Sequence, residues 1–285
     1  TRRNKRRTMK LAAIQMISTP NISENVAAAE RLIISAASQG AKLVVLPEYF
    51  PMIGATDAAR LAARETEGHG PIQTFLVQMA QRHQLWIVGG SLPLAAKDST
   101  KLRNSCLVFN PDGERVARYD KIHLFGFHKD EEHYDESLTI EPGRDIVTCE
   151  TPCGKMGLSI CYDLRFAELY RGMGVISLIV VPAAFTETTG QAHWETLLRA
   201  RAIENQCYVV AAAQGGRHPN GRLTHGNSMI IDPWGVILAR IEKGEGLITA
   251  DFDAQKMIDI RTRLPALQHR VFSVSIQLSF GLQGS

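Results

Sequence analysis

Long apolar runs are missing from this sequence of 285 residues. No stretch reaches the roughly 18–20 apolar residues that a membrane-spanning helix requires, and no hydrophobic segment near the start has the form of a signal peptide. Cysteine is scarce as well: there are five, an odd number, and they lie mostly in apolar runs. This usage argues against a disulfide framework and favours a reducing compartment. We therefore expect a cytoplasmic protein that does not contact a membrane.

An excess of charge of either sign is also missing, because 32 Lys and Arg stand against 29 Asp and Glu. Five of the positive charges lie within residues 1–8, so the rest of the chain carries 27 against 29, or −2. We expect this basic segment to be an N-terminal extension. Since the body of the chain has no basic excess, the sequence predicts no nucleic-acid partner.

Several common functional motifs are absent. The sequence has no complete GxGxxG or GxxxxGK[ST] loop for nucleotides, no GxSxG of serine hydrolases and no HExxH of zinc enzymes. His123, His128 and His133 recur every five residues, but no cysteine or carboxylate pair completes a metal-ligand set. We therefore expect surface or structural histidines, and no metal or organic cofactor.

Strand-like and helix-like segments alternate along the chain. Apolar runs typical of strands occupy residues 10–16, 42–46, 85–89, 104–110, 115–120, 155–161, 176–181, 207–213, 227–231, 236–240 and 247–252. Patterns typical of helices occupy residues 23–39, 72–83, 166–173, 193–205 and 253–261. His193 is then expected to open a helix as a capping or packing group.

The organisation of these segments predicts one domain. Continuous apolar strands indicate sheets that are buried on both faces, and hairpins in the same chain indicate that the sheets are mixed. No linker or change of composition divides the chain. We expect an α/β domain over residues 9–272, with residues 1–8 as the basic extension and residues 273–285 as a C-terminal arm.

Three residues of different chemistry follow strand-like runs. Cys161 lies at a turn from strand to helix, where free N–H groups and the helix dipole favour a thiolate and can hold an oxyanion. The alternative is a buried, inert thiol. Glu48 is either an exposed loop acid or a buried base for that thiol, and Lys121 is either a surface lysine or part of the same site. Because ligand sites of α/β folds lie at strand ends, the three could converge on one rim of a sheet.

Three motifs around these residues carry a family resemblance. They are Leu46-Pro47-Glu48, Tyr119-Asp120-Lys121-Ile122-His123-Leu124 and Ile160-Cys161-Tyr162-Asp163-Leu164-Arg165-Phe166. With them the sequence resembles the nitrilase superfamily of carbon–nitrogen hydrolases, from Met9 to about Phe272. The resemblance implies a four-layer α-β-β-α sandwich of two mixed sheets, and a homodimer or higher homo-oligomer.

The resemblance also implies a Glu-Lys-Cys triad. Carried over, Glu48 is the general base, Lys121 stabilises the tetrahedral intermediate and Cys161 is the nucleophile. The Cys161 thiolate would attack an amide carbonyl, Lys121 and the N–H of Tyr162 would hold the oxyanion, and Glu48 would return the proton to ammonia.

A second glutamate of the family is matched by Glu136, in the segment that ends with Pro142-Gly143. Glu141 is a neighbour that could be confused with it and is the poorer match. In the implied reaction, either Glu48 or Glu136 would activate the water that cleaves the thioester.

The sequence after the nucleophile refines the resemblance. Tyr162-Asp163 stands where nitrilases typically have Trp, and residues 193–218, 232–235 and 264–270 resemble the deaminated-glutathione amidases more closely than the omega-amidases. This implies hydrolysis of a small carboxylate amide to acid and ammonia. The implied substrate is deaminated glutathione (2-oxoglutaramate on Cys-Gly), and the implied role is metabolite repair.

Three alternatives remain. The protein could be an omega-amidase acting on 2-oxoglutaramate, another short aliphatic amidase, or an inactive member that serves as a binding or scaffold protein. The intact triad argues against the inactive member.

Such a dicarboxylate substrate needs cations near its carboxylates, and arginine suits bidentate capture. The candidate substrate-binding residues are Arg165, Phe185, Thr186, Arg217 and Arg222. The competing interpretation is a surface or ion-paired role for each arginine and core packing for Phe185. Asn227 stands where many relatives have histidine, and it leaves the fine specificity open.

Overall fold

Two β-sheets face each other at the centre of the molecule, which a computed structural model describes over residues 8–129 and 132–272. In the first sheet the strand order is β15-β1-β2-β3-β5-β4, with β6 paired to β5. These strands are β1 (Thr8–Gln15), β2 (Leu43–Val45), β3 (Trp86–Val88), β4 (Leu92–Ala95), β5 (Leu102–Phe109), β6 (Arg115–Asp120) and β15 (Gly246–Asp253). The order in the second sheet is β14-β13-β12-β11-β10-β9. Its strands are β9 (Thr148–Thr151), β10 (Gly154–Leu158), β11 (Leu178–Ala183), β12 (Tyr208–Ala213), β13 (Ser228–Ile231) and β14 (Ile237–Ile241).

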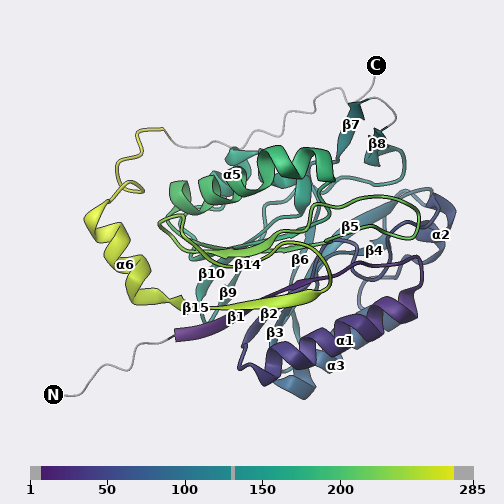
Figure 1. Ribbon diagram of the computed structural model, residues 1–285, viewed down its shortest axis with the longest axis horizontal. Coiled ribbons are helices and arrows are strands. Elements are labelled where there is room, and N and C mark those ends of the chain that lie inside the picture. Colours follow the sequence, from purple (N-terminus) through teal and green to yellow (C-terminus); the bar gives the residue numbers. More distant parts are fainter. Residues whose placement is uncertain (1–7, 130–131, 273–285) are drawn as a thin grey trace.

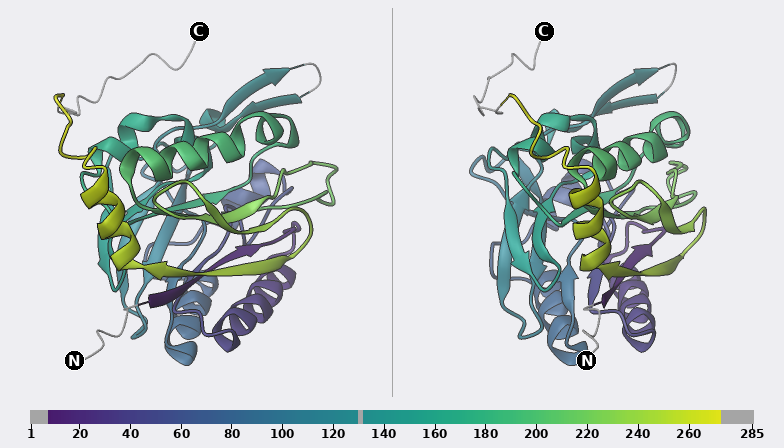
Figure 2. Two further views of the ribbon diagram at one scale, coloured as in Figure 1. Left: turned by 60° about the vertical axis from the view of Figure 1, so that its left-hand side comes forward. Right: turned by 90° about the vertical axis from the view of Figure 1, so that its left-hand side faces the viewer.

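Helices cover the outer faces of the two sheets (Figure 1). On the first sheet lie α1 (Ile22–Ser38) and α3 (Pro71–His83), and on the second lie α4 (Ala167–Gly172) and α5 (Glu187–Asn205). Figure 2 shows the same layers from the side, with α6 (Ala254–Arg263) at one margin. Both sheets are mixed, since β1 pairs parallel with β2 and antiparallel with β15, and β10 pairs parallel with β11 and antiparallel with β9. The predicted α-β-β-α sandwich is therefore confirmed.

Strand β2 illustrates why its apolar run is continuous. Successive side chains of a strand point to opposite faces. Val45 packs in the core between the two sheets, and its neighbour Val44 packs in the core between the first sheet and its helices. Both are fully buried, so neither position accepts a polar side chain.

The start of α5 differs from the prediction. The helix begins at Glu187 rather than at residue 193, because Thr186 caps it: the Thr186 hydroxyl accepts a hydrogen bond from the Thr189 N–H at 3.2 Å. His193 thus lies inside the helix, where its ring nitrogen is 3.1 Å from the Arg165 guanidinium. The expectation that His193 opens a helix is wrong.

Short elements escaped prediction. They are β4, β9, α2 (Asp57–Ala62) and the hairpin of β7 (Gly126–Lys129) with β8 (Glu132–Asp135). None is longer than six residues, so a periodic apolar pattern has no room to develop. Within the described ranges, no helix has the length and apolarity needed to cross a membrane. Thr8 already belongs to β1, whereas residues 1–7 of the extension and the arm over 273–285 lie outside the described residues.

The carboxyl ends of several strands meet at one end of the sandwich and position the site. Glu48 follows β2, Lys121 follows β6 and Cys161 follows β10. Strands β10, β11 and β12 run parallel, so the segments after them emerge on the same side of the second sheet. The convergence of the three strand ends on one rim is thus a result of strand direction.

Candidate active site

Three side chains from three strand ends meet in one buried cavity. The Lys121 ammonium donates a hydrogen bond to Glu48 Oε1 at 2.9 Å and to Glu136 Oε2 at 2.8 Å. The thiol of Cys161 lines the same cavity, where the negative charge of Glu48 raises its pKa and the charge of Lys121 opposes that rise. Glu48 and Lys121 are each 1% exposed and Cys161 is 7% exposed. The alternatives of an exposed loop acid for Glu48 and a surface lysine for Lys121 are therefore wrong.

The structure distinguishes the two candidate glutamates. Glu136 begins a 3₁₀ turn, η1 (Glu136–Leu138), and its carboxylate lines the cavity with Lys121. Glu141 instead pairs with Arg103 and accepts a hydrogen bond from the Asp98 N–H at 3.1 Å. Glu136 is therefore the residue that the fold brings to the triad.

The carboxylate of Glu136 is surrounded by donors. It accepts hydrogen bonds from the Tyr49 hydroxyl at 2.7 Å, from Lys121 and from the Phe125 N–H at 2.8 Å. Burial by itself would raise the pKa of Glu136, but the charge of Lys121 and these hydrogen bonds outweigh burial and lower the pKa. This carboxylate is held ionised and is poorly placed to accept a further proton.

Cys161 has an unusual backbone and a raised pKa. It opens a 3₁₀ turn, η2 (Cys161–Arg165), with φ of 50°, a value that non-glycine residues rarely adopt. Burial and the negative charge of Glu48 raise the pKa of the thiol well above 9.0, and the opposing charge of Lys121 does not offset them. This direction opposes the expectation that the turn favours a thiolate. A single 3₁₀ turn has too small a dipole to overcome this burial.

The predicted substrate-binding residues divide into two groups. Arg165, Phe185, Thr186 and Arg222 line the cavity together with Tyr162. The Arg165 guanidinium lies 5.4 Å from the centre of the Phe185 ring, and Arg222 donates to the Ala184 carbonyl at 3.1 Å. Arg217 is exposed and is not among the residues around this cavity, so the structure does not support its inclusion. Asn227 is buried elsewhere, with its amide oxygen facing Arg240.

A family model supplies the deciding comparison. The model of the carbon-nitrogen hydrolases matches residues 10–262, which is nearly the whole chain. The chain belongs to the carbon–nitrogen hydrolase family. It is a hydrolase that acts on carbon–nitrogen bonds in amides.

Individual relatives agree with this assignment. A deaminated glutathione amidase of Synechocystis is 45% identical over 92% of this chain and 97% of its own length. The omega-amidase NIT2 of Danio rerio is 38% identical over 92% of this chain and 94% of its own length. Among solved structures, yeast Nit3, a member of branch 10 of the nitrilase superfamily, superposes with a TM-score of 0.84 at 32% identity, covering 93% of this chain and 97% of the other.

Two residues that support the hydrolase site were not predicted. Asn104 on β5 is 1% exposed. Its side-chain amide donates to Glu48 Oε1 at 3.0 Å, and its backbone carbonyl accepts a hydrogen bond from the backbone N–H of Lys121 at 2.9 Å. Tyr49 has a φ of 54° and its hydroxyl binds Glu136. Asn104 lies between Arg103 and Ser105 in β5, so no apolar pattern marks it, and none marks Tyr49.

Asp163 joins the loops that carry the nucleophile and the lysine. This fully buried carboxylate accepts hydrogen bonds from the Tyr119 hydroxyl at 2.7 Å and from the Ile160 N–H at 2.9 Å, and it lies 2.7 Å from a ring nitrogen of His123. The ring of His123 is in turn stacked on Phe166 at 3.6 Å between centres. His123 is therefore structural, as expected, and across the described residues no three His, Cys, Asp or Glu side chains are grouped to hold a metal.

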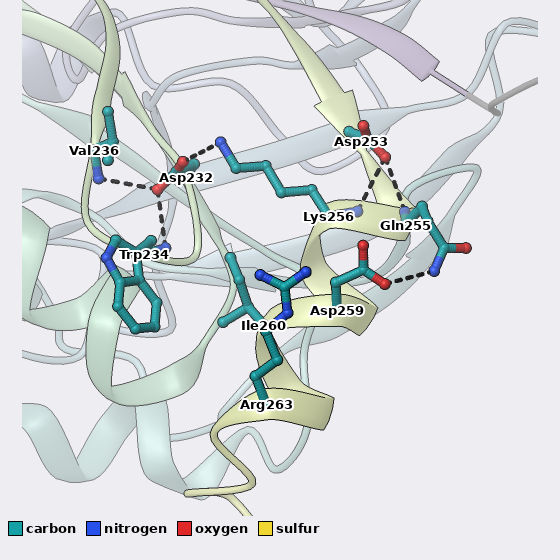
Figure 3. A pocket seen from close by; sticks show the side chains of 9 residues that line it. All are labelled: Asp232, Trp234, Val236, Asp253, Gln255, Lys256, Asp259, Ile260 and Arg263. Carbon is teal, nitrogen blue, oxygen red and sulfur yellow. Dashed lines mark hydrogen bonds and ion pairs between the residues drawn. The ribbon is translucent and has the colours of Figure 1, made fainter.

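Another cavity, of about 500 Å³, lies between α6 and the turn that joins β13 to β14 (Figure 3). Its charged pair is Lys256 with Asp232, 2.5 Å apart. Asp232 also accepts hydrogen bonds from the Trp234 and Val236 N–H groups, both at 2.9 Å, which closes the turn. This cavity shares no residue with the triad cavity and contains no nucleophile, so it is not the reaction centre.

The Tyr49 hydroxyl offers a test of how Glu136 is held. In Tyr49→Phe we expect kcat to fall about tenfold, because a charge-assisted hydrogen bond to a buried carboxylate is lost. That hydrogen bond lowers the pKa of Glu136, so its removal raises the pKa and moves the acidic limb of the kcat–pH profile to higher pH. Tyr208→Phe is the matched control, since that hydroxyl contacts Asp253. An unmoved acidic limb would mean that Tyr49 only packs.

Proposed function

We propose that this hydrolase cleaves amides through a thioester on Cys161, with Glu48 as general base and acid, and that its substrate is deaminated glutathione. The observation that carries the mechanism is the burial of the Cys161 thiol, the Glu48 carboxylate and the Lys121 ammonium in one cavity. A thiol with a raised pKa needs a base at contact distance when it attacks. Glu48 fills that role without any proton passing through solvent.

The first half-reaction forms the thioester. As Sγ bonds to the amide carbonyl carbon, Glu48 takes the thiol proton, and the carbonyl oxygen becomes an oxyanion held by Lys121 and the Tyr162 N–H. Glu48 then protonates the amide nitrogen, the carbon–nitrogen bond breaks and the amine leaves.

The second half-reaction releases the acid. Glu48 takes a proton from water as the water oxygen bonds to the thioester carbon, and the carbon–sulfur bond breaks to give the acid and, with the proton returned, the thiol. We assign this base role to Glu48 rather than Glu136, because donors bind both oxygens of Glu136, whereas Asn104 and Lys121 both donate to Oε1 of Glu48.

The substrate decides which amine leaves. Ammonia is released from a primary amide such as 2-oxoglutaramate. In deaminated glutathione the bond that breaks joins the 2-oxoglutaryl group to cysteine, so the amine that leaves is Cys-Gly. The expectation of ammonia therefore holds only for the smaller substrate, and 2-oxoglutarate is the product common to both.

Support for the larger substrate comes from the relatives and from the cations of the cavity. The Synechocystis relative named a deaminated glutathione amidase is more similar to this chain than the Danio rerio omega-amidase is, at 45% against 38% identity. Arg165 and Arg222 line the cavity beside Cys161, as do Phe185 and Thr186. We assign the two arginines to the binding of substrate carboxylates, and Phe185 and Thr186 to further contacts with the substrate. The complete triad speaks against an inactive scaffold protein.

The test is 2-oxoglutarate release from each compound in parallel. We expect kcat/KM for deaminated glutathione to exceed that for 2-oxoglutaramate by about tenfold or more, a difference of about 1.4 kcal/mol in transition-state binding. The reverse preference would make the protein an omega-amidase. If the protein hydrolyses neither compound and Cys161 still reacts with an alkylating reagent, the substrate assignment is overturned and the proposed mechanism stands.

Glu48→Gln tests the base. We expect kcat to fall by about 10³-fold, within the range for loss of a general base. Alkylation of Cys161 by iodoacetamide should become slow at neutral pH and rise about tenfold per pH unit, since the thiol must then ionise unaided. A variant whose alkylation rate does not depend on pH would contradict the pairing of Glu48 with the thiol.

We further propose a homodimer or larger homo-oligomer in the cytoplasm. Exposed apolar side chains at Val175, Ile203 and Leu264 are candidates for burial between copies. Every cysteine in the described ranges is free, which is compatible with a reducing compartment. Light scattering of the purified protein tests the assembly, and a strict monomer would contradict it.

A further inference from the structure

A second, wider cavity lies beside the triad cavity. The inner cavity around Cys161 has a volume of about 10 Å³, and the outer one about 510 Å³. Phe125, Glu136 and Arg222 line both, so the two are adjacent. About 10–15 Å³ is what a single water molecule requires. The outer cavity is therefore the adjacent space that is large enough for a peptide beyond the reacting amide.

Two arginine side chains line this outer cavity. One is Arg60 on α2 and the other is Arg222. In each, the Nε atom is buried and has no hydrogen-bond partner. A buried charged donor without a partner is unfavourable, and a carboxylate that accepts from it removes the cost. Figure 1 shows α2 and the β7–β8 hairpin, which together carry part of this cavity, at the same end of the molecule.

The carboxylates around the outer cavity already have partners. Glu136 is bound by Lys121 and Tyr49, and Asp135 accepts from the Ser137 N–H at 2.9 Å. Asp57 pairs with the terminal nitrogen Nη2 of Arg60 and leaves Nε unoccupied. Although these three carboxylates lie nearby, the Nε atoms of Arg60 and Arg222 still have no hydrogen-bond partner.

We infer that Arg60 and Arg222 form an outer anion subsite that binds a carboxylate at the far end of a peptide-like leaving group. This inference rests on the proposed function, in which that group is the glycine carboxylate of Cys-Gly. The Arg222 side chain, which lies 5.2 Å over the Tyr134 ring and is anchored on the Ala184 carbonyl, stands at the junction of the two cavities. Arg60 lies further out and sets the preference for a charged end.

Affinity labels test the subsite without depending on the natural substrate. Chloroacetyl-Ala-Gly and its C-terminal amide both alkylate Cys161 by displacing chloride, and they differ only in the terminal charge. We expect the wild-type protein to react about tenfold faster with the carboxylate, and Arg60→Gln to lose this preference. Arg64→Gln is the matched control: it removes the same charge four residues along the chain, and that side chain donates to the Leu61 and Ser99 carbonyls instead.

For a second variant we expect a change of the opposite sign in the preference for the charged label. This variant keeps the test valid if Arg60→Gln folds poorly. Asp57→Asn retains Arg60 and removes its competing carboxylate, so the preference for the charged label should increase. Equal rates for the two labels in the wild-type protein, or a preference that Arg60→Gln retains, would overturn the subsite.

Hydrolysis kinetics separate this inference from the proposed function. With deaminated glutathione, Arg60→Gln should raise KM about tenfold with little change in kcat, and the increase with 2-oxoglutaramate should be much smaller. If KM increased equally for both compounds, Arg60 would contact the acyl part that they share. The assignment of Arg60 to the leaving group would then be wrong. If the wild-type protein hydrolyses neither compound, the proposed function fails, and the labels still report on the subsite.

Discussion

Replacement of Cys161 by alanine should abolish amide hydrolysis, with kcat lowered by at least about 10⁴-fold, because the residues that line the cavity include no second thiol to form the acyl intermediate. The variant should fold, since the thiol makes few contacts that a methyl group cannot replace and alanine leaves only a small gap. Release of 2-oxoglutarate measures the first expectation, and the urea midpoint measures the second.

The matched control for this variant is Cys207→Ala. Cys207 is a fully buried cysteine directly before β12 and lies outside the cavity. It should remain active and become slightly less stable. Substantial turnover by a folded Cys161→Ala protein would remove the nucleophile assignment, and a loss of activity in Cys207→Ala alone would point to a different thiol.

Replacement of Lys121 by methionine should damage both activity and stability. The Lys121 ammonium lies between the Glu48 and Glu136 carboxylates, within hydrogen-bond distance of both. Without it two buried carboxylates face each other, and removal of one partner from a buried ion pair costs about 3–5 kcal/mol. The oxyanion also loses a donor, which costs about 10²–10³-fold in kcat. Urea unfolding and 2-oxoglutarate release measure the two effects.

The double variant Lys121→Met/Glu136→Gln separates these causes. It removes one carboxylate along with the cation, so the free energy of unfolding should recover in part while the activity stays low. If Lys121→Met alone were as stable as the wild-type protein, the carboxylates would have to be protonated or hydrated in its absence. The charge arrangement described for the resting site would then be wrong.

Local sequence pattern predicted the positions of the triad but not its state. The strand-like segments before Glu48, Lys121 and Cys161 located three strand ends, and strand direction brings such ends together. The pattern could not reveal that the pKa of Cys161 is raised, because the pKa depends on burial and on Glu48, which is distant in the sequence. The turn at the nucleophile suggested the opposite charge state.

Other features depend on contacts that no local pattern encodes. The start of α5 is set by one hydroxyl, that of Thr186, while the residues that follow are too polar to show an apolar stripe. The choice of Glu136 over Glu141 depends on which carboxylate reaches Lys121 and which reaches Arg103. Arg60 escaped notice because the six-residue helix that carries it has no buried face.

The pairing of a neutral thiol with Glu48 has a consequence for the charge of the reaction centre. Before attack, two carboxylates and one ammonium group sum to −1. In the tetrahedral intermediate Glu48 is neutral and the substrate oxygen carries the negative charge, so the sum is again −1. Charge is redistributed over a few ångströms and none enters or leaves the buried region, which spares the protein the solvation cost of a new ion. The chemical step should therefore be almost indifferent to ionic strength, and salt should act on the binding of the charged substrate alone.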